Sequence, residues 1–133
     1  MRTSRMITLL AVALAGAILA APLAGCQGST KRGSVYNIKP DRRIEAYMPG
    51  ALERVHKTAL EVVRDDFAYS IRREAVDARE GVIEARTARD ESVRVDTYIA
   101  GGSVTRIEVK VGMLGDVQAA RDILSAIEAR LKQ

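Results

Sequence analysis

The 133-residue chain has few of the residue types from which catalytic and metal sites are built. It contains one cysteine, Cys26, one histidine, His56, one phenylalanine and no tryptophan. A lone cysteine has no disulfide partner within the chain, and a lone histidine leaves no second imidazole for a transition-metal centre. Aromatic residues make up only 4% of the sequence, which argues against a stacking surface for nucleic-acid bases. We therefore expect no metal, no cofactor and no nucleic-acid partner.

The sequence also lacks the usual signatures of a catalytic nucleophile. There is no Gly-x-Ser-x-Gly nucleophile elbow, and His56 would have to serve any histidine-dependent triad alone. The adjacent acids Asp65–Asp66 and Asp90–Glu91 lie at the ends of expected elements, where solvated turn acids are usual. We predict that the protein is not an enzyme and has no catalytic residues.

The net charge of +4 is distributed unevenly along the chain. Residues 1–43 hold seven basic residues and a single acid, Asp41, whereas residues 44–133 hold fourteen basic and sixteen acidic residues. The basicity is therefore a property of the N-terminal third, and the remainder is slightly acidic. Nucleic-acid binding requires clustered positive charge on a folded surface, so this distribution removes its main support.

The first 25 residues have the layout of a secretory signal peptide. Arg2 and Arg5 precede a predominantly apolar run from Ile7 to Leu23, and small residues follow it. The run of about 17 residues is at the short end for a transmembrane helix, and a proline near its end is typical of a cleavage region. We interpret residues 1–25 as a signal peptide that is removed from the mature protein.

The sequence Leu23-Ala24-Gly25-Cys26 resembles the lipobox of bacterial lipoproteins. This resemblance implies that a diacylglyceryl group is attached to the thiol of Cys26, that cleavage occurs before it, and that the new amine is acylated. Two or three acyl chains, such as palmitate, would hold the protein at a membrane. Gln27 follows the cysteine where inner-membrane lipoproteins of Gram-negative bacteria carry Asp. The resemblance thus implies a lipid-anchored protein of the cell envelope, on the periplasmic face of the outer membrane.

The mature chain divides into a linker and one expected domain. Residues 26–42 comprise the lipidated cysteine and a segment rich in Gly, Ser, Thr and basic residues, which predicts a flexible tether. Sixteen extended residues reach about 55 Å at most. Residues 43–133 are of the right length for a single small domain.

Hydrophobic periodicity over residues 43–133 predicts an α+β domain with the order β-α-β-β-β-β-α, in which two helices pack on a small antiparallel sheet. The helices are expected at residues 51–64 and 117–131, and the strands at 43–47, from Phe67 to Ile71, 81–87, 92–99 and 103–111. A turn from Gly112 to Gly115 precedes Asp116, a favourable N-cap for the second helix. Arg73 continues the inward alternation after Phe67, so either it lines a polar pocket or the strand twists at Ile71.

The last two strands are expected to form a hairpin around Gly101 and Gly102. One placement of the turn sets Asp96 opposite Arg106, whereas moving the turn by one residue sets Asp96 opposite Glu108. Opposite charges stabilise a cross-strand pair and like charges destabilise it. We therefore predict the first register.

One segment resembles a known family. Val-Gly-Met-Leu-Gly-Asp at residues 111–116, followed by Ile123, Leu124 and Ile127, is similar to a family of short, uncharacterised bacterial lipoproteins classed as a domain of unknown function. The similarity runs from about Arg43 to Leu131 and implies no activity or ligand. The layout also resembles the helix-grip domains in the lipoprotein of the outer-membrane β-barrel assembly machine, which is an analogy of fold alone.

Together these features predict a membrane-anchored envelope lipoprotein of unknown molecular activity. Its domain is expected to be a non-catalytic structural or protein-interaction module with an envelope protein as partner. An alternative stays open, in which a lipid or small apolar ligand binds between sheet and helices. A cavity of about 300 Å³ or more in that layer would favour the ligand. The sequence specifies no oligomeric state.

Overall fold

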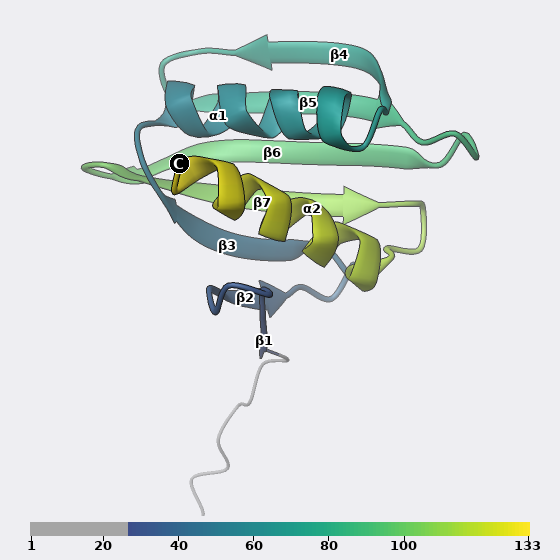
Figure 1. Ribbon diagram of the computed structural model, residues 1–133, viewed down its shortest axis with the longest axis horizontal. Coiled ribbons are helices and arrows are strands. Elements are labelled where there is room, and N and C mark those ends of the chain that lie inside the picture. The colour runs from purple at the N-terminus through teal and green to yellow at the C-terminus, as the bar shows by residue number, and fades with distance from the viewer. Residues whose placement is uncertain (1–26) are drawn as a thin grey trace, which may run out of the picture.

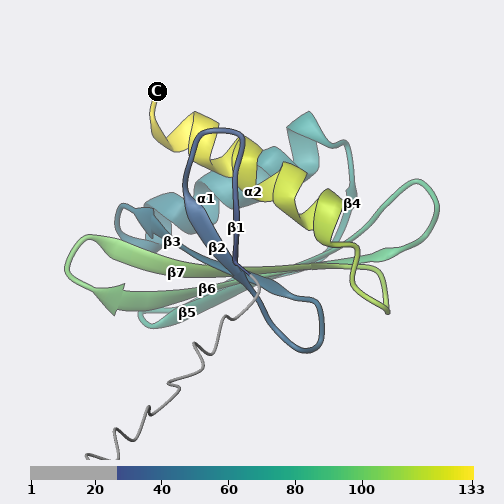
Figure 2. The same ribbon diagram turned by 90° about the horizontal axis from the view of Figure 1, so that it is seen from below.

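A computed structural model describes residues 27–133. They form one seven-stranded antiparallel sheet in the order β1-β2-β3-β7-β6-β5-β4, with both helices on the same face (Figures 1 and 2). The predicted α+β class is thereby confirmed. The predicted signal peptide and lipobox, including Cys26, lie outside the described residues. Within residues 27–133, no helix combines the length and apolar character needed to cross a membrane.

The elements follow the predicted order and add two strands before it. The strands are β1 (Gln27–Ser29), β2 (Val35–Ile38), β3 (Ile44–Pro49), β4 (Ser70–Val76), β5 (Glu80–Arg86), β6 (Ser92–Gly101) and β7 (Val104–Val111). The helices are α1 (Leu52–Glu61), which continues as a π-helical turn η1 (Val62–Asp66), and α2 (Val117–Leu131).

A single core lies between the sheet and the two helices. Alternate residues of the central strands face the helices, and these meet apolar positions spaced three or four apart on α1 and α2. Burial of this layer supplies the main driving force for folding. Its fully buried members are Ile44, Met48, Val55, Ala59, Val62, Val63, Ile83, Val95, Ile107, Val109, Ala120, Ile123, Leu124 and Ile127.

The start of α2 is defined by its cap. The side chain of Asp116 accepts a hydrogen bond of 3.0 Å from the backbone N–H of Ala119, which satisfies a donor left free in the first helical turn. Gly112 and Gly115 in the preceding turn have backbone φ angles of +72° and +78°. Residues other than glycine rarely adopt such positive φ angles. This turn therefore redirects the chain from the end of β7 onto the inner face.

The prediction of a flexible tether over residues 26–42 is wrong from Gln27 onward. Residues 27–29 and 35–38 form β1 and β2, and β2 pairs with β3 through Tyr36↔Ala46 and Ile38↔Ile44. The physical reason is that Tyr36 and Ile38 alternate toward the inner face, where the ring of Tyr36 joins the core. The sheet thus starts directly after Cys26.

A buried carboxylate fastens the β1–β2 hairpin to α2. Glu128 of α2 is only 1% exposed, and its oxygens accept hydrogen bonds of 2.5 Å from the hydroxyls of Thr30 and Ser34 and of 2.7 Å from Lys132 Nζ. Burial raises the pKa of Glu128, but the hydrogen bonds from Lys132, Ser34 and Thr30 outweigh it, so the pKa lies below its ordinary value. The charged form is therefore the one that holds the hairpin.

The strand after α1 begins later than predicted. Phe67 and Tyr69 lie before β4, half-buried against the core, with ring centroids 5.4 Å apart. A bulge interrupts the pairing of β4 with β5 between Ile71 and Arg73. An extra residue reverses the inward–outward alternation, so Arg73 faces away from the helices. The inward pocket considered for Arg73 does not form.

The register predicted for the β6–β7 hairpin is also wrong. Asp96 lies opposite Glu108, and Arg94 lies opposite Lys110, so the rejected alternative is the one that forms. A shift between Ile99 and Gly101 allows a tight turn while keeping the core residues on one face. The like charges are tolerated because residues outside the hairpin compensate them.

Glu128→Gln should lower the free energy of unfolding by about 1–3 kcal/mol, because neutralising a buried acceptor weakens its charge-assisted hydrogen bonds. Urea unfolding followed by far-UV circular dichroism measures the change. The matched control is Asp122→Asn on the same helix, which breaks the partly exposed Lys31–Asp122 pair at 3.4 Å and should cost less than about 1 kcal/mol. Equal effects of the two changes would contradict the role assigned to Glu128.

Candidate functional site

The face of the sheet opposite the helices is organised around Glu108 of β7. This carboxylate is only 4% exposed. One oxygen accepts a hydrogen bond of 2.8 Å from Lys39 Nζ, and the other accepts one of 2.7 Å from Arg43 Nη1. Lys39 also lies 2.8 Å from Glu45 of β3. Both cations come from the β2–β3 turn, which therefore closes over the sheet.

The electrostatics of this cluster favour its charged form. Burial raises the pKa of Glu108, but the hydrogen bonds from Lys39 and Arg43 outweigh it and hold the pKa below its ordinary value. The hydrogen bond to Glu108, joined by the one to Glu45, raises the pKa of Lys39. Each charge thus stabilises its partners, and the side chains are held in fixed positions.

A second group of ion pairs lies beside the first on β5 and β6. Arg94 donates to Asp96 at 2.9–3.0 Å and to Glu84 at 2.8 Å. The guanidinium of Arg106 lies 4.3 Å from the centroid of the Tyr98 ring, a distance typical of a cation–π contact. The Arg94–Glu84 pair, whose acid lies on β5, adds to the compensation that the like charges of the β6–β7 register require.

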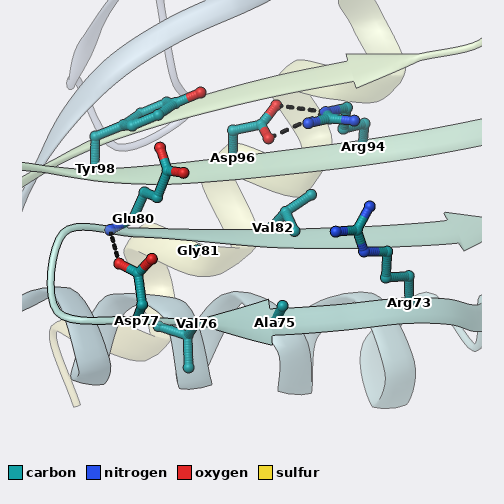
Figure 3. A pocket seen from close by; sticks show the side chains of 10 residues that line it. All are labelled: Arg73, Ala75, Val76, Asp77, Glu80, Gly81, Val82, Arg94, Asp96 and Tyr98. Carbon is teal, nitrogen blue, oxygen red and sulfur yellow. Dashed lines mark hydrogen bonds and ion pairs between the residues drawn. The ribbon is translucent and has the colours of Figure 1, made fainter.

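A polar hollow of about 310 Å³ opens on this face at the β4–β5–β6 corner (Figure 3). Arg73 and Arg94 stand on one side of it, while Tyr98 and Glu80 stand on the other. Asp77 accepts hydrogen bonds from the backbone N–H groups of Arg79 and Glu80, which fixes the β4–β5 turn. The hollow presents charges of both signs and no geometry of a catalytic pair.

His56 is buried on the other side of the sheet. It is 3% exposed, with Nδ1 3.1 Å from the Thr97 hydroxyl and Nε2 3.0 Å from a Glu74 oxygen. Gly81 leaves the room for its ring, because a Cβ there would lie 2.4 Å from Nδ1. The arrangement satisfies both ring nitrogens and joins α1 to the edge strand β4.

The turn residues singled out from the sequence form a projecting tip. Gly112, Gly115 and Asp116 fold the turn, while Met113 and Leu114 between them are 87% and 85% exposed. Sequence reasoning identified the turn but gave no role to these two apolar side chains. The residues predicted to form a lipobox, Leu23, Ala24 and Gly25, and the predicted lipid acceptor Cys26 precede the described part of the chain.

Sequence reasoning missed Lys39 and Arg43 as members of the Glu108 cluster, because both fell at or beside the predicted tether. Their signal was the alternation of Tyr36 with Ile38, which marks a short strand just before them. Residues 27–133 contain no group of three or more His, Cys, Asp or Glu side chains placed to hold a metal ion.

The stability of the Glu108 cluster should depend on pH. A carboxylate whose pKa is lowered by folding contributes stability above its unfolded pKa, and this contribution is lost as the pH falls through the folded pKa. Its ordinary value is 4.5, so the loss is expected below about pH 4.5. Glu108→Gln should weaken the acid dependence of unfolding and cost about 1–3 kcal/mol at pH 7.

Urea titrations between pH 3 and pH 7 test this dependence. Glu84→Gln is the matched control, because its partly exposed pair with Arg94 should contribute less than about 1 kcal/mol. An unchanged acid dependence in Glu108→Gln would refute the role given to the cluster.

The comparison with protein families gives one match. The profile of the family described as "Protein of unknown function (DUF3568)" matches residues 4–130. The match thus extends further toward the N-terminus than the similarity inferred from Arg43 onward, and it includes the apolar run and Cys26. No curated protein matches the chain.

Proposed function

We propose that this chain, which belongs to the DUF3568 family, is a lipoprotein anchored through Cys26 to a membrane of the bacterial envelope. Its domain is there a non-catalytic module that binds a protein partner. By its lipobox and by Gln27 after the cysteine, the proposed location is the periplasmic face of the outer membrane. The family description, a protein of unknown function, is compatible with this proposal and supplies no activity.

The main support for the proposal is that the first strand begins directly beside Cys26. Gln27 already pairs with Asn37, so the first strand follows the Cys26 acceptor with no residue between them. The hydrogen bonds of Glu128 to Thr30 and Ser34 then tie this strand's hairpin to α2. Acyl chains on Cys26 would therefore hold the folded domain itself at the membrane surface.

We propose that the protein is not a catalyst because its reactive side chains are buried and hydrogen-bonded to other groups. The sole histidine is buried and bonded on both ring nitrogens. The buried acid Glu108 accepts hydrogen bonds from the cations Lys39 and Arg43. The buried acid Glu128 accepts them from two hydroxyls and from the ammonium group of Lys132. A general acid or base must be able to reach its substrate, and these groups are buried and engaged with their partners.

The outer sheet face supports a role in protein binding. It is free of helices (Figure 2), and Tyr47 is exposed on it next to Arg106, its cross-strand neighbour. Arg106 also stacks on Tyr98. Tyrosine and arginine are enriched in protein interfaces, and their fixed positions here lower the entropy cost of binding.

The packing does not favour the alternative of an apolar ligand between sheet and helices. That layer is filled by side chains such as Met48, Ile107 and Leu124, which are fully buried. The described hollows, between about 220 and 470 Å³, open instead on the outer face and at the two ends of the sheet. A small apolar molecule would have to displace core side chains to enter the inner layer.

Intact-mass spectrometry of the protein purified from membranes tests the anchor. The mature mass should equal residues 26–133 plus a diacylglyceryl group and an amide-linked acyl chain. Cys26→Ser removes the thiol nucleophile, so it should abolish the added mass. Expressed behind an ordinary cleavable signal peptide in place of residues 1–25, that variant should leave the membrane fraction.

The matched control adds Ser29→Cys to the Cys26→Ser chain, which restores a thiol three residues away. Because acylation depends on the lipobox position, this control should remain unmodified. An unmodified Cys26 on a soluble native protein would end the proposal.

Photo-crosslinking in living cells tests the protein-binding role. A photoreactive phenylalanine analogue at Tyr47 or Tyr98 should give the same discrete adduct, identified by mass spectrometry. The analogue at Gln118, exposed on α2, should give none because it lies on the helical face. Adducts that are equally abundant from Gln118, or absent from both tyrosines, would contradict the assigned face.

A further inference from the structure

We propose that the end of the sheet nearest Gln27 is a second membrane contact, in which Met113 and Leu114 enter the bilayer interface and Arg72, Arg86 and Lys110 meet anionic phospholipid headgroups. The inference rests on the proposed lipid anchor and deepens it, because it fixes how the anchored domain stands on the membrane. The end in question carries the β2–β3 turn (39–43), the β5–β6 turn (87–91) and the β7–α2 turn (112–116), which we call the anchor end.

The apolar tip is rigid and points away from the core. The backbone N–H of Asp116 donates to the Val111 carbonyl at 2.7 Å, which closes the turn. Gly115 packs directly on the β2–β3 turn, since a Cβ there would lie 2.5 Å from Arg42 Cβ. Turns are ordinarily polar, yet this one holds Met113 and Leu114 almost fully in water. Transfer of two such side chains to an apolar phase favours docking by at least about tenfold.

A basic hollow of about 410 Å³ lies directly beside the tip, and Met113 forms part of its wall. Four cations line it with a single acid, Glu84, which is already paired with Arg94. The four basic residues are Arg72, Arg86, Arg94 and Lys110. Phosphate groups favour such sites, because arginine donors match their oxygens.

Three of these cations lack a close carboxylate partner. Arg72 forms no ion pair within residues 27–133, while Arg86 and Lys110 have their nearest acids at 3.9 Å and 3.8 Å. By contrast, Lys39 and Arg43 on the same face meet their acids at 2.7–2.8 Å. The hollow therefore retains positive charge that an anionic headgroup can neutralise.

The position of Gln27, which follows the proposed lipid attachment site, favours a lipid bilayer as the partner of this surface. The pairs Gln27↔Asn37, Asn37↔Glu45 and Glu45↔Glu108 place Gln27 level with the middle of β7, and β1 runs from there away from the end that carries the apolar tip. The β2–β3 and β7–α2 turns both project below the sheet, on the side away from the helices (Figure 2). Consecutive Cα atoms are about 3.8 Å apart, so lipid on Cys26 would hold the start of β1 close to the membrane surface, and the side of the sheet on which these turns project could then face the bilayer.

Environment-sensitive fluorescence on the lipidated full chain tests the contact. Acylation consumes the thiol of Cys26, so Met113→Cys or Leu114→Cys provides one free thiol for a nitrobenzoxadiazole (NBD) label. The control label is at Ser103→Cys, in the exposed turn at the opposite end of the sheet. Each protein is reconstituted into vesicles of phosphatidylethanolamine and phosphatidylglycerol that contain a fraction of brominated lipid.

The labels at 113 and 114 should show blue-shifted emission and quenching by the brominated acyl chains, and the label at 103 should show neither. Flotation of the vesicles in a density gradient measures separately whether the lipid anchor holds the chain on them. A chain that floats while both tip labels stay in water would overturn the second contact and leave the anchor standing. A chain that does not float would overturn the anchor and, with it, this inference.

The charged part of the contact is tested in the Met113→Cys chain. Arg72→Gln, Arg86→Gln and Lys110→Gln should each shift the equilibrium between inserted and free tip by about fivefold, because one basic side chain near an anionic surface contributes about that factor. Lys57→Gln, on the exposed side of α1, should have no effect. Vesicles of pure phosphatidylcholine should produce the same loss as the three changes together, and equal insertion in both lipids would refute the headgroup site.

Discussion

The position of the N-terminal hairpin depends on one buried carboxylate, Glu128. Without it, β1 and β2 would be a three-residue and a four-residue strand at the edge of a sheet, which is too little structure to be stable alone. The bonds to Thr30 and Ser34 transfer the stability of α2 to this hairpin across about 100 residues of sequence. Because the hairpin is fixed, so are the β2–β3 turn that follows it and the point at which the chain leaves Cys26.

The β2–β3 turn in turn accounts for the charges on the outer face. It brings Lys39 and Arg43 over Glu108, and these two cations make it possible for Glu108 to lie opposite Asp96 in the β6–β7 ladder. The inner face is held by apolar burial and the outer face by ion pairs. The two faces are therefore linked through the same N-terminal segment.

The spacing of apolar residues was enough to predict the helices and strands in which that spacing repeats several times. The alternation in β6 and β7, the helical spacing in α1 and α2 and the Asp116 cap are local signals of this kind. The β1–β2 hairpin could not be predicted in the same way, because only Tyr36 and Ile38 mark its inner face.

The incorrect register predicted for the β6–β7 hairpin follows from that omission. Charge pairing was judged within the hairpin, whereas two of the cations that compensate it come from elsewhere: Lys39 had been assigned to the tether, and Arg43 to the start of the first predicted strand. The bulge that turns Arg73 outward leaves no sequence pattern of its own.

A flexible tether of sixteen residues would let the domain sample a shell about 55 Å deep in any orientation. A sheet that begins at Gln27 removes that freedom. With the anchor end on the bilayer, β6 of ten residues extends at most about 33 Å from it. Tyr47, Tyr98 and Arg106 lie toward the far half of the outer face, since Tyr47 and Tyr98 both pair with Arg106 near the β6–β7 turn. In the proposed arrangement the uncompensated cations would face the lipid, and the aromatic and arginine side chains would lie where a partner at the same membrane could reach them. A rigid attachment presents this surface at one height and orientation, so a partner fixed in the same membrane binds without the entropy cost of ordering a tether.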